Sequence, residues 1–359
     1  MRMNLASKTT LTAFAAALVL AASCGKPCSP SLDKTINLDG DDFKTIELPQ
    51  PKTLDLGVDG IRSFRFYNGN LYATASNGGD ILYVFSHDGG ELKGSFLKKG
   101  RGPSELLSVP YCASFCFDGS GNDAVIRFND HNSRRLLKFD ITGSLAGGEA
   151  VMSEIGKIGG KNDITSVMVL SDDSYIGKRL TMNGDCQERY VVSNGEEYAT
   201  EDMEKLNSVH IDAPDGAYNF NVFSGFFGYS RNRSMICEAM LFLKSIHVYS
   251  LDGTSEGFTI FYGGGPADVN VLGKDLVHYL GGQYLGVSAN ERFFAAMYGA
   301  PMRSSMIQIY SWDGEPLGKI ELGYEAGNFD IDAETGDLIT YNSSEEIVRF
   351  YHVPELATL

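Results

Sequence analysis

The chain has 359 residues, and its 46 acidic and 30 basic side chains give a formal net charge of −16. This acidic balance argues against a nucleic-acid partner, which needs a basic footprint on the protein. The length exceeds that of one ordinary domain unless the fold is a closed array of repeats.

The first residues have the pattern of an export segment. Arg2 and Lys8 precede an apolar run over 11–22, which is too short to span a bilayer and fits the core of a secretory signal. Small residues end the run directly before Cys24, an arrangement that resembles the lipobox of bacterial lipoproteins. The resemblance implies cleavage after residue 23 and a membrane anchor at Cys24, because several acyl chains hold a protein stably. The alternative is an ordinary signal peptide with a chance cysteine.

The cysteines give no disulfide framework, because an odd number remains once Cys24 is set aside. The five others are Cys28, Cys112, Cys116, Cys186 and Cys237. We expect Cys112 and Cys116 to share one strand, roughly 13 Å apart and too distant to bridge. They have no matching cluster for a metal, and we expect buried thiols. A bridge between Cys186 and Cys237 stays open.

Six segments of alternating apolar and polar residues recur at intervals of roughly fifty residues, a period that suits a propeller blade. They are ILYVFSHDGGEL from Ile81, RLLKFDITGSL from Arg135, RYVVSNGEEY from Arg189, IHVYSLDGTSEG from Ile246, MIQIYSWDGEPLG from Met306 and IVRFYHVPEL from Ile347. The alternation is typical of half-buried strands. Turns rich in Asp, Asn and Gly follow five of the segments and predict hairpins.

Two more strands precede each segment, so each unit predicts four antiparallel strands, or one blade. Only 200–209 looks helical. The sixth unit lacks its last strand, and the segment 43–49 is a spare strand. We expect this N-terminal strand to pair as the outer strand of blade six and close the ring, because closure removes unpaired edges. The sequence therefore predicts an all-β, six-bladed propeller.

A GRGPSE segment from Gly100 follows the first blade. With the lipobox and the six units, it makes the chain resemble the TolB-like six-bladed propeller lipoproteins of Bacteroidota. The resemblance covers Cys24 to the C-terminus, and it implies a fold and an envelope location but no established activity. Because no acidic cluster follows Cys24, it implies an outer-membrane anchor facing the periplasm. We assign 1–23 to a signal peptide, 24–40 to a tether and 41–359 to the propeller.

The loops after the second strands and the connections between blades share one face of such a propeller. These segments are longer and more varied than the tight turns, so we expect the functional site there. Basic groups on this face favour an anionic or sugar-like ligand. The ligand-binding candidates are Arg101, Glu105, Asp130, Arg134, Lys178, Arg179, Tyr298 and Arg303. The alternative is that these charges are solvated or pair with neighbouring carboxylates.

Two further features bear on this face. A second GxGP motif at Gly263 occupies the junction after blade four. We interpret both copies as mostly architectural. The position of Arg101 in the first copy is Gly264 in the second, so Arg101 is the residue of this motif that could have a role in ligand binding. An aromatic stretch from Tyr218 should mainly pack between blades, although its Tyr218 or Tyr229 is placed to stack a sugar at the channel.

Enzyme motifs are absent from the sequence, which has no GxSxG at a strand–helix turn and no HExxH. We therefore assign no catalytic residue and no cofactor, and favour an envelope-anchored binding or scaffolding protein. Its partner would be a small anionic ligand, a glycan or a protein. One alternative is a metal-dependent hydrolase of the lactonase type, with Asp130, Asp163 and Asn342 as ligands. Another is an accessory subunit of an outer-membrane uptake assembly.

Overall fold

The computed structural model describes residues 29–119, 123–160, 163–212, 219–276, 281–300 and 303–359. Cys24, Cys28 and Tyr218 lie outside these ranges. None of the helices within them has the length and apolar character that crossing a membrane requires.

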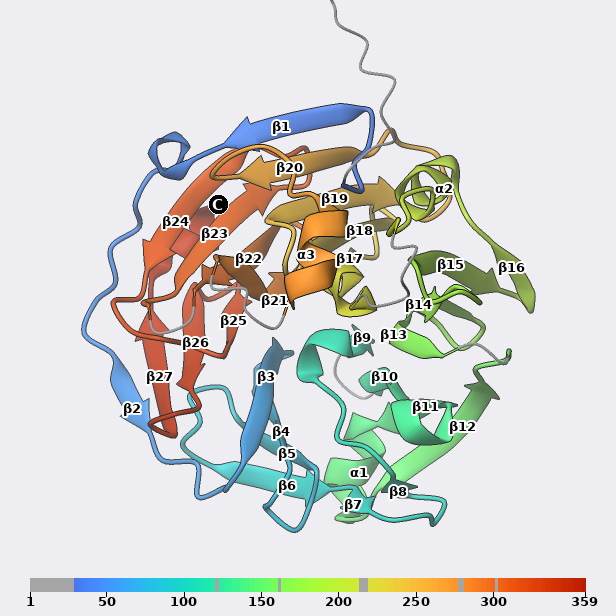
Figure 1. Ribbon diagram of the computed structural model, residues 1–359. Coiled ribbons are helices and arrows are strands. Elements are labelled where there is room, and N and C mark those ends of the chain that lie inside the picture. Colours follow the sequence, from blue (N-terminus) through green and yellow to red (C-terminus); the bar gives the residue numbers. More distant parts are fainter. Residues whose placement is uncertain (1–28, 120–122, 161–162, 213–218, 277–280, 301–302) are drawn as a thin grey trace, which may run out of the picture.

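Six sheets surround a central axis, and each contains four antiparallel strands. The predicted all-β, six-bladed propeller is therefore confirmed (Figure 1). Blade one holds β3 (Ile61–Tyr67), β4 (Asn70–Ala75), β5 (Leu82–Ser86) and β6 (Leu92–Phe96). Blade two holds β9 (Cys116–Asp118), β10 (Val125–Asp130), β11 (Arg135–Asp140) and β12 (Val151–Lys157). Blade three holds β13 (Ile164–Val169), β14 (Ser174–Leu180), β15 (Gln187–Ser193) and β16 (Glu196–Tyr198).

The second half of the ring repeats this order. Blade four holds β17 (Gly225–Ser230), β18 (Met235–Met240), β19 (Ser245–Ser250) and β20 (Phe258–Tyr262). Blade five holds β21 (Gln283–Ala289), β22 (Phe293–Gly299), β23 (Met306–Ser311) and β24 (Pro316–Glu321). Blade six holds β25 (Asn328–Asp332), β26 (Asp337–Asn342) and β27 (Ile347–His352), with β2 (Lys52–Leu54) as its outer strand. The six recurring segments of the sequence supply the third strand of each blade.

An N-terminal strand closes the ring as predicted, but it is β2 rather than the segment 43–49. β2 pairs antiparallel with β27. The segment 43–49 lies instead on blade five, where the Ile46 N–H donates to the carbonyl oxygen of Lys319 at 2.8 Å. Pro49 and Pro51, which lack an N–H, separate that segment from β2 and prevent one continuous ladder.

Residues 34–54, which end with β2, form a belt along the outside of blades four to six (Figure 1). It begins with β1 (Lys34–Leu38), which lies within the range expected to be a tether. β1 pairs in parallel with β20 and makes a fifth strand on blade four. The belt therefore covers the outer edges of three consecutive blades.

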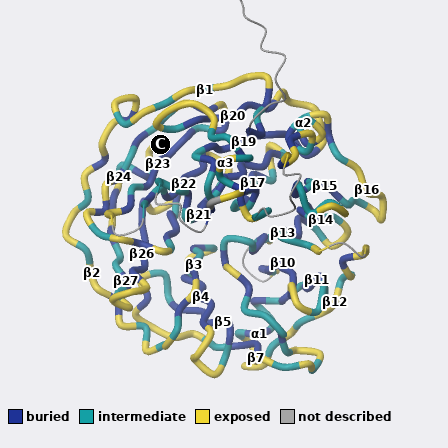
Figure 2. The backbone as a smooth tube through the Cα atoms, viewed as in Figure 1, coloured by how far each residue is buried: buried dark blue, intermediate teal, exposed yellow. Residues whose placement is uncertain are grey.

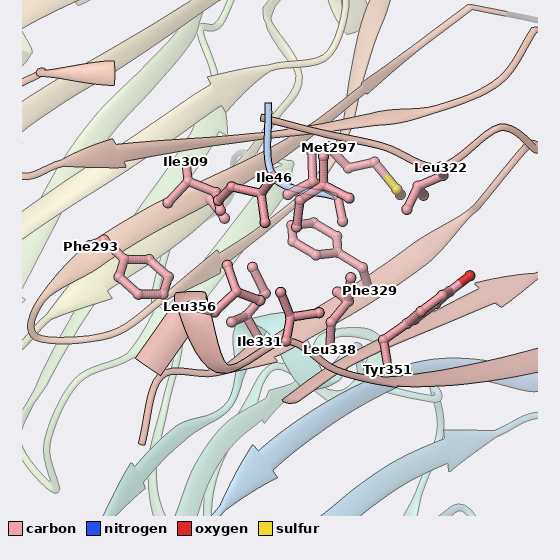
Figure 3. Packing of buried hydrophobic residues seen from close by; sticks show 14 of the residues in the cluster. Ile46, Phe293, Met297, Ile309, Leu322, Phe329, Ile331, Leu338, Tyr351 and Leu356 are labelled. Carbon is pink, nitrogen blue, oxygen red and sulfur yellow. The ribbon is translucent and has the colours of Figure 1, made fainter. Parts of the chain in front are cut away.

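Apolar clusters fill the spaces between neighbouring blades. Middle strands such as β18 and β26 are buried along their whole length, because both faces pack against other blades, whereas exposed residues gather on the rim (Figure 2). The prediction of half-buried strands concerned the third strand of each blade, and it is wrong for β19, which is buried along its whole length. Between blades five and six, Ile46 of the belt reaches the cluster of Phe293, Phe329 and Leu356 (Figure 3).

Short helices lie in the connections between strands. The predicted helix is α2 (Glu201–Asn207), and two others were not expected: α1 (Ile141–Gly147) and α3 (Val269–Asp275). Asp140 caps α1 by accepting the Gly143 N–H at 2.8 Å, which turns the expected hairpin turn of blade two into a helix. The 3₁₀ turns are η1 (Gly40–Asp42), η2 (Cys112–Ser114), η4 (His131–Ser133), η5 (Phe220–Phe223) and η7 (Pro354–Thr358).

The four described cysteines are buried free thiols, Cys186 and Cys237 included. The expectation that Cys112 and Cys116 share one strand is wrong, because Cys112 begins η2 and Cys116 begins β9. Burial raises the pKa of the Cys112 thiol to about 12 and that of the Cys186 thiol to about 11. Thiols held this firmly in the protonated state are structural rather than reactive.

Candidate functional site

A hollow of about 590 Å³ opens at one end of the central channel, and we call it the turn-side hollow. Its described lining residues are Arg65, Phe66, Tyr67, Asn68, Ala113, Phe115, Cys116, Phe117, Asp118, Gly119, Met168, Gly228, Tyr229, Arg231, Ala289, Asn290, Glu291, Arg292, Asp330, Ile331, Asp332, Ala333 and Glu334. The innermost strand of every blade contributes, and the first tight turns of the blades form the mouth. The volume suits a small molecule, since such sites span roughly 300–1,000 Å³. This mouth is opposite to the face that the sequence favoured.

An ion pair between Arg65 of β3 and Asp330 of β25 joins blades one and six in the wall of this hollow. Arg65 Nη1 lies 3.3 Å from Asp330 Oδ1, and Arg65 Nη2 donates to the Ala289 carbonyl oxygen at 2.5 Å. Asp330 also accepts from the Ser288 hydroxyl and the Phe66 N–H, each at 2.6 Å. Burial raises the pKa of Asp330, and Arg65 opposes that shift. Both side chains are thus fixed before a ligand binds.

Arg231 crosses the mouth from blade four to blade two. It pairs with Asp118 at the end of β9 and donates to the Phe117 carbonyl oxygen at 3.3 Å. Arg127 Nη1 lies 2.9 Å from the other carboxylate oxygen of Asp118. The hydrogen bond from Arg231, supported by Arg127, holds the pKa of Asp118 well below its usual range. Asp118 therefore stays ionised, and its charge is matched by its two partners.

Three lining side chains carry polar groups that form no hydrogen bond within the described residues and stay accessible: the partly exposed Tyr229 hydroxyl, and the exposed Asn68 amide and Glu334 carboxylate. The Asn290 amide nitrogen also has no partner there, but it is fully buried beneath the wall. The three accessible groups are the donors and acceptors that a bound molecule can reach.

Charge in the turn-side hollow is mixed, with an acidic excess. Three arginines face five carboxylates among the described lining residues: Arg65, Arg231 and Arg292 against Asp118, Glu291, Asp330, Asp332 and Glu334. An excess of two negative charges disfavours an anionic ligand. The hollow also has aromatic surfaces, because the rings of Tyr67 and Phe117 stack at 4.6 Å beside the mouth.

The GRGPSE candidates lie on the connection from blade one to blade two: Arg101 follows β7 (Lys98–Lys99), and Glu105 begins β8 (Glu105–Leu106). Arg101 is exposed. The Glu105 carboxylate accepts the Gly102 N–H at 2.7 Å. A Cβ on Gly100 would come within 2.0 Å of that carboxylate, so a larger residue there would displace the end of the Glu105 side chain.

The second GxGP copy uses its glycines differently. Gly263 and Gly264 have φ angles of +66° and +128°, which favour glycine on conformational grounds. The two motifs share a position in the fold but differ in their backbone geometry. The backbone geometry fits an architectural role at both junctions, and ligand binding by Arg101 stays a prediction.

Asp130 is fully buried at the end of β10 and organises the loop after blade one. Its carboxylate accepts the N–H groups of Leu107 and Ser108, at 3.0 and 3.1 Å, and the Ser133 hydroxyl at 2.5 Å. Arg135 Nη2 bonds the same carboxylate and also the backbone carbonyl of Glu105. The structure thus brings Asp130 and the backbone of Glu105 together, in a structural arrangement.

Lys178 and Arg179 are adjacent on β14 and have different surroundings. Lys178 is fully buried between blades three and four, where Nζ lies 2.5 Å from Glu238 Oε1. It is therefore not a surface charge. Arg179 pairs with Glu188 at 3.4 Å and with Glu197 at 2.8 Å on the outer half of blade three.

The other candidates lie on two blades, with Arg134 on blade two and both Tyr298 and Arg303 on blade five. Arg134 Nη1 donates to the Gly160 carbonyl oxygen at 2.7 Å. Tyr298 packs edge-on against the ring of Tyr262 at 5.0 Å, and Arg303 is exposed after β22. A role of these residues in ligand binding stays a prediction.

Two of the three residues considered as metal ligands, Asn342 and Asp130, have their side-chain oxygens engaged in other hydrogen bonds. Asn342 Oδ1 accepts the N–H groups of Ser344 and Glu345, and the oxygens of Asp130 are occupied as described above. Asp163 is exposed at the start of blade three. Within the described ranges, no three His, Cys, Asp or Glu side chains are grouped as metal ligands would be.

Sequence reasoning missed most charged residues of the turn-side hollow. Arg65, Asp118, Arg231, Glu291 and Asp332 each lie within a few residues of the turn after the first strand of a unit. Charges repeated at this one position of the repeat were the available signal. Tyr229 was singled out, and it does line the channel.

Comparisons with known proteins give no family. No family model and no curated protein matches the chain. Similar solved structures include a Bacteroides fragilis protein described as exported, 14% identical with a TM-score of 0.48 over 89% of this chain and 99% of that one. The β-propeller domain of Myceliophteria thermophila Cps50 (Swd1) is 10% identical, with a TM-score of 0.44 over 84% and 98%. A luciferin-regenerating enzyme is 9% identical, with a TM-score of 0.45 over 84% and 94%. These likenesses are too weak to bear on function, and the six-bladed architecture rests on the strand pairing itself.

Proposed function

We propose that this protein is a lipid-anchored binding protein of the cell envelope whose turn-side hollow holds a neutral glycan fragment. One observation carries the proposal: accessible donors and acceptors, led by the Tyr229 hydroxyl and the Asn68 amide, line a hollow of about 590 Å³ whose ion pairs are already satisfied. A rigid propeller with such a hollow suits binding or scaffolding, because no loop has to be ordered first.

The chemistry of the hollow favours a sugar over an anion. Sugar hydroxyls both donate and accept hydrogen bonds, as do the free groups of the wall. The acidic excess repels carboxylates and phosphates. Tyr229 and Tyr67 combine an apolar ring with a polar tip, which matches the two-sided surface of a sugar ring.

The cellular part of the proposal rests on the lipobox before Cys24. The sequence pattern supports export, lipidation and membership of the TolB-like propeller lipoproteins, with the anchor in the outer membrane facing the periplasm. Metabolic labelling with an alkyne-bearing palmitate tests the anchor. We expect label on the wild-type protein and none on Cys24→Ala, and equal labelling would overturn this part.

Calorimetric titration tests the ligand. Cellobiose, maltose and diacetylchitobiose serve as neutral probes, and digalacturonate serves as the anionic match. We expect saturable binding of at least one neutral disaccharide and weaker binding of digalacturonate. Tyr229→Phe should lower the affinity about three- to tenfold, the effect of one hydrogen bond.

Tyr198→Phe is the matched control, because it removes a hydroxyl from a partly exposed tyrosine outside the hollow. Its affinity should equal that of the wild type. The proposal fails if only digalacturonate binds, if no neutral disaccharide binds, or if Tyr229→Phe binds as tightly as the wild type.

A further inference from the structure

A second hollow, of about 320 Å³, lies on the other side of a partition in the channel, and we call it the loop-side hollow. Ala113 of η2 and Met168 of β13 line both hollows and form this partition. The wall comes from the connection between blades one and two, the end of β10, and the strands β13 and β17. It lies toward the face that the sequence favoured for function.

The loop-side hollow differs from its neighbour in charge. Among its described lining residues there is no Asp, Glu, Lys or Arg, the exposed His131 is the one imidazole, and Val109, Tyr111, Phe226 and Phe227 are among the apolar members. A charged ligand would lose its hydration here without meeting a carboxylate, ammonium or guanidinium counter-charge. The aromatic side chains offer flat faces to a ring. The chemistry therefore selects an uncharged, aromatic molecule.

Asn129 is the polar group that gives this hollow a specific feature. Its side chain lines the hollow, the residue is 8% exposed, and within the described residues its carboxamide has no hydrogen-bond partner. The next residue back, Phe128, points to the opposite side of β10 and packs against Phe115. Its amide atoms are not among the fully buried unpaired atoms of the described residues, so the amide keeps a surface in the hollow and can meet a group that enters there.

A carboxamide presents one acceptor and one donor side by side. Its best complement is a second carboxamide or a lactam, which presents the same two groups in reverse order. A carboxylate satisfies only the donor and repels the amide oxygen. A bulge in the pairing of β13 between Ile164 and Ser166 shapes the facing wall, as bulges often do beside sites.

We infer that the loop-side hollow is a second binding site, for an uncharged aromatic ligand that carries a carboxamide or lactam, and that Asn129 recognises this group. The site is independent of the glycan site on the far side of Ala113 and Met168.

Ligand-observed fluorine NMR on the intact protein tests this assignment. The probes are 4-(trifluoromethyl)benzamide and 4-(trifluoromethyl)benzoate, which share a shape and differ in charge. We expect saturable binding of the benzamide and at least tenfold weaker binding of the benzoate. Ser166→Trp should fill the hollow and abolish benzamide binding. Asn129→Leu, of similar size, should weaken it about three- to tenfold and reduce the discrimination against benzoate.

Tyr229→Phe, in the other hollow, is the control and should leave benzamide binding unchanged. Thermal melts followed by circular dichroism check that each variant is folded. If Ser166→Trp does not fold, the result for Asn129→Leu decides between the two outcomes. The inference is overturned if the wild type shows no saturable benzamide binding, or if both probes bind equally. It is also overturned if Ser166→Trp or Asn129→Leu binds the benzamide with wild-type affinity, or if the benzamide competes with a neutral disaccharide.

Discussion

Replacing Glu238 by leucine should lower the free energy of unfolding by about 3–5 kcal/mol. Glu238 is fully buried in β18, where its two oxygens lie 2.5 Å from Lys178 Nζ and 2.6 Å from Arg189 Nε. The two cations, which are also fully buried, hold the pKa of Glu238 well below its usual range against the effect of burial. Without the carboxylate, two buried positive charges lose their counter-ion. Urea denaturation measures the loss, and a change below 1 kcal/mol would contradict it.

Lys178→Met is the matched control, because it removes the surplus cation and leaves Arg189 paired with Glu238 at two atoms. We expect its stability to stay within about 1–2 kcal/mol of the wild type. Burial lowers the pKa of Lys178 to about 8 in the folded protein. Between pH 8 and the ordinary lysine pKa of about 10.4, the unfolded chain binds more protons than the native one. The wild type should therefore gain stability relative to Lys178→Met as the pH rises through this window.

Asp130→Ala should cost about 3 kcal/mol and loosen the connection between blades one and two. The carboxylate accepts bonds from Leu107, Ser108, Ser133 and Arg135, and these hold Ser108 and the following residues against the loop-side hollow. Burial opposes ionisation, but these hydrogen bonds outweigh it and keep the pKa of Asp130 below its ordinary value. Urea denaturation and amide hydrogen exchange across 104–114 measure the two effects.

The pH dependence gives this prediction a distinctive signature. A depressed pKa contributes stability above the unfolded value of about 3.9 and loses it as the pH falls through the folded value. The gap between wild type and Asp130→Ala should therefore be full at pH 6 and shrink below pH 3.9. Ser133→Ala, which removes one of the bonds, should cost about 1 kcal/mol. A gap that is constant from pH 6 to pH 2.5 would contradict the assignment.

The repeat made the propeller predictable, because turn chemistry and alternation mark the third strand of every blade from Phe85 to Tyr351. The closing strand was misplaced for a local reason. Both 43–49 and 52–54 are extended segments, and their partners are set by the packing of Ile46 between blades rather than by either segment alone. The helix α1 was missed because Asp140 can begin a hairpin turn or cap a helix.

The candidate site was harder to predict, because burial of charge is not visible in the chain. Lys178 and Asp130 are charged residues at positions that the repeat assigns to the loop-rich face. Both are nevertheless buried, and both bond to groups elsewhere in the chain. Conversely, Asp330 and Arg65 form a pair only because blade six lies next to blade one in the closed ring. Contacts of this kind depend on which strand ends meet at the axis. A repeat pattern predicts these neighbours only once the number of blades and their order in the ring are known.

The belt of residues 34–54 also sets an order of folding. Its three attachments, to β20, to Lys319 of β24 and to β27, bind strands that are synthesised roughly two to three hundred residues later. The N-terminal part of the fold therefore cannot finish pairing until the C-terminal strand is present. The pairing of β2 with β27 joins residues far apart in sequence, and contacts of this kind slow folding. Until each part of the belt has docked, the outer edges of blades four to six stay open to other chains, and the edge of blade six waits for β27. A stalled or truncated chain would therefore be prone to aggregate through these three edges, although most of its blades are complete.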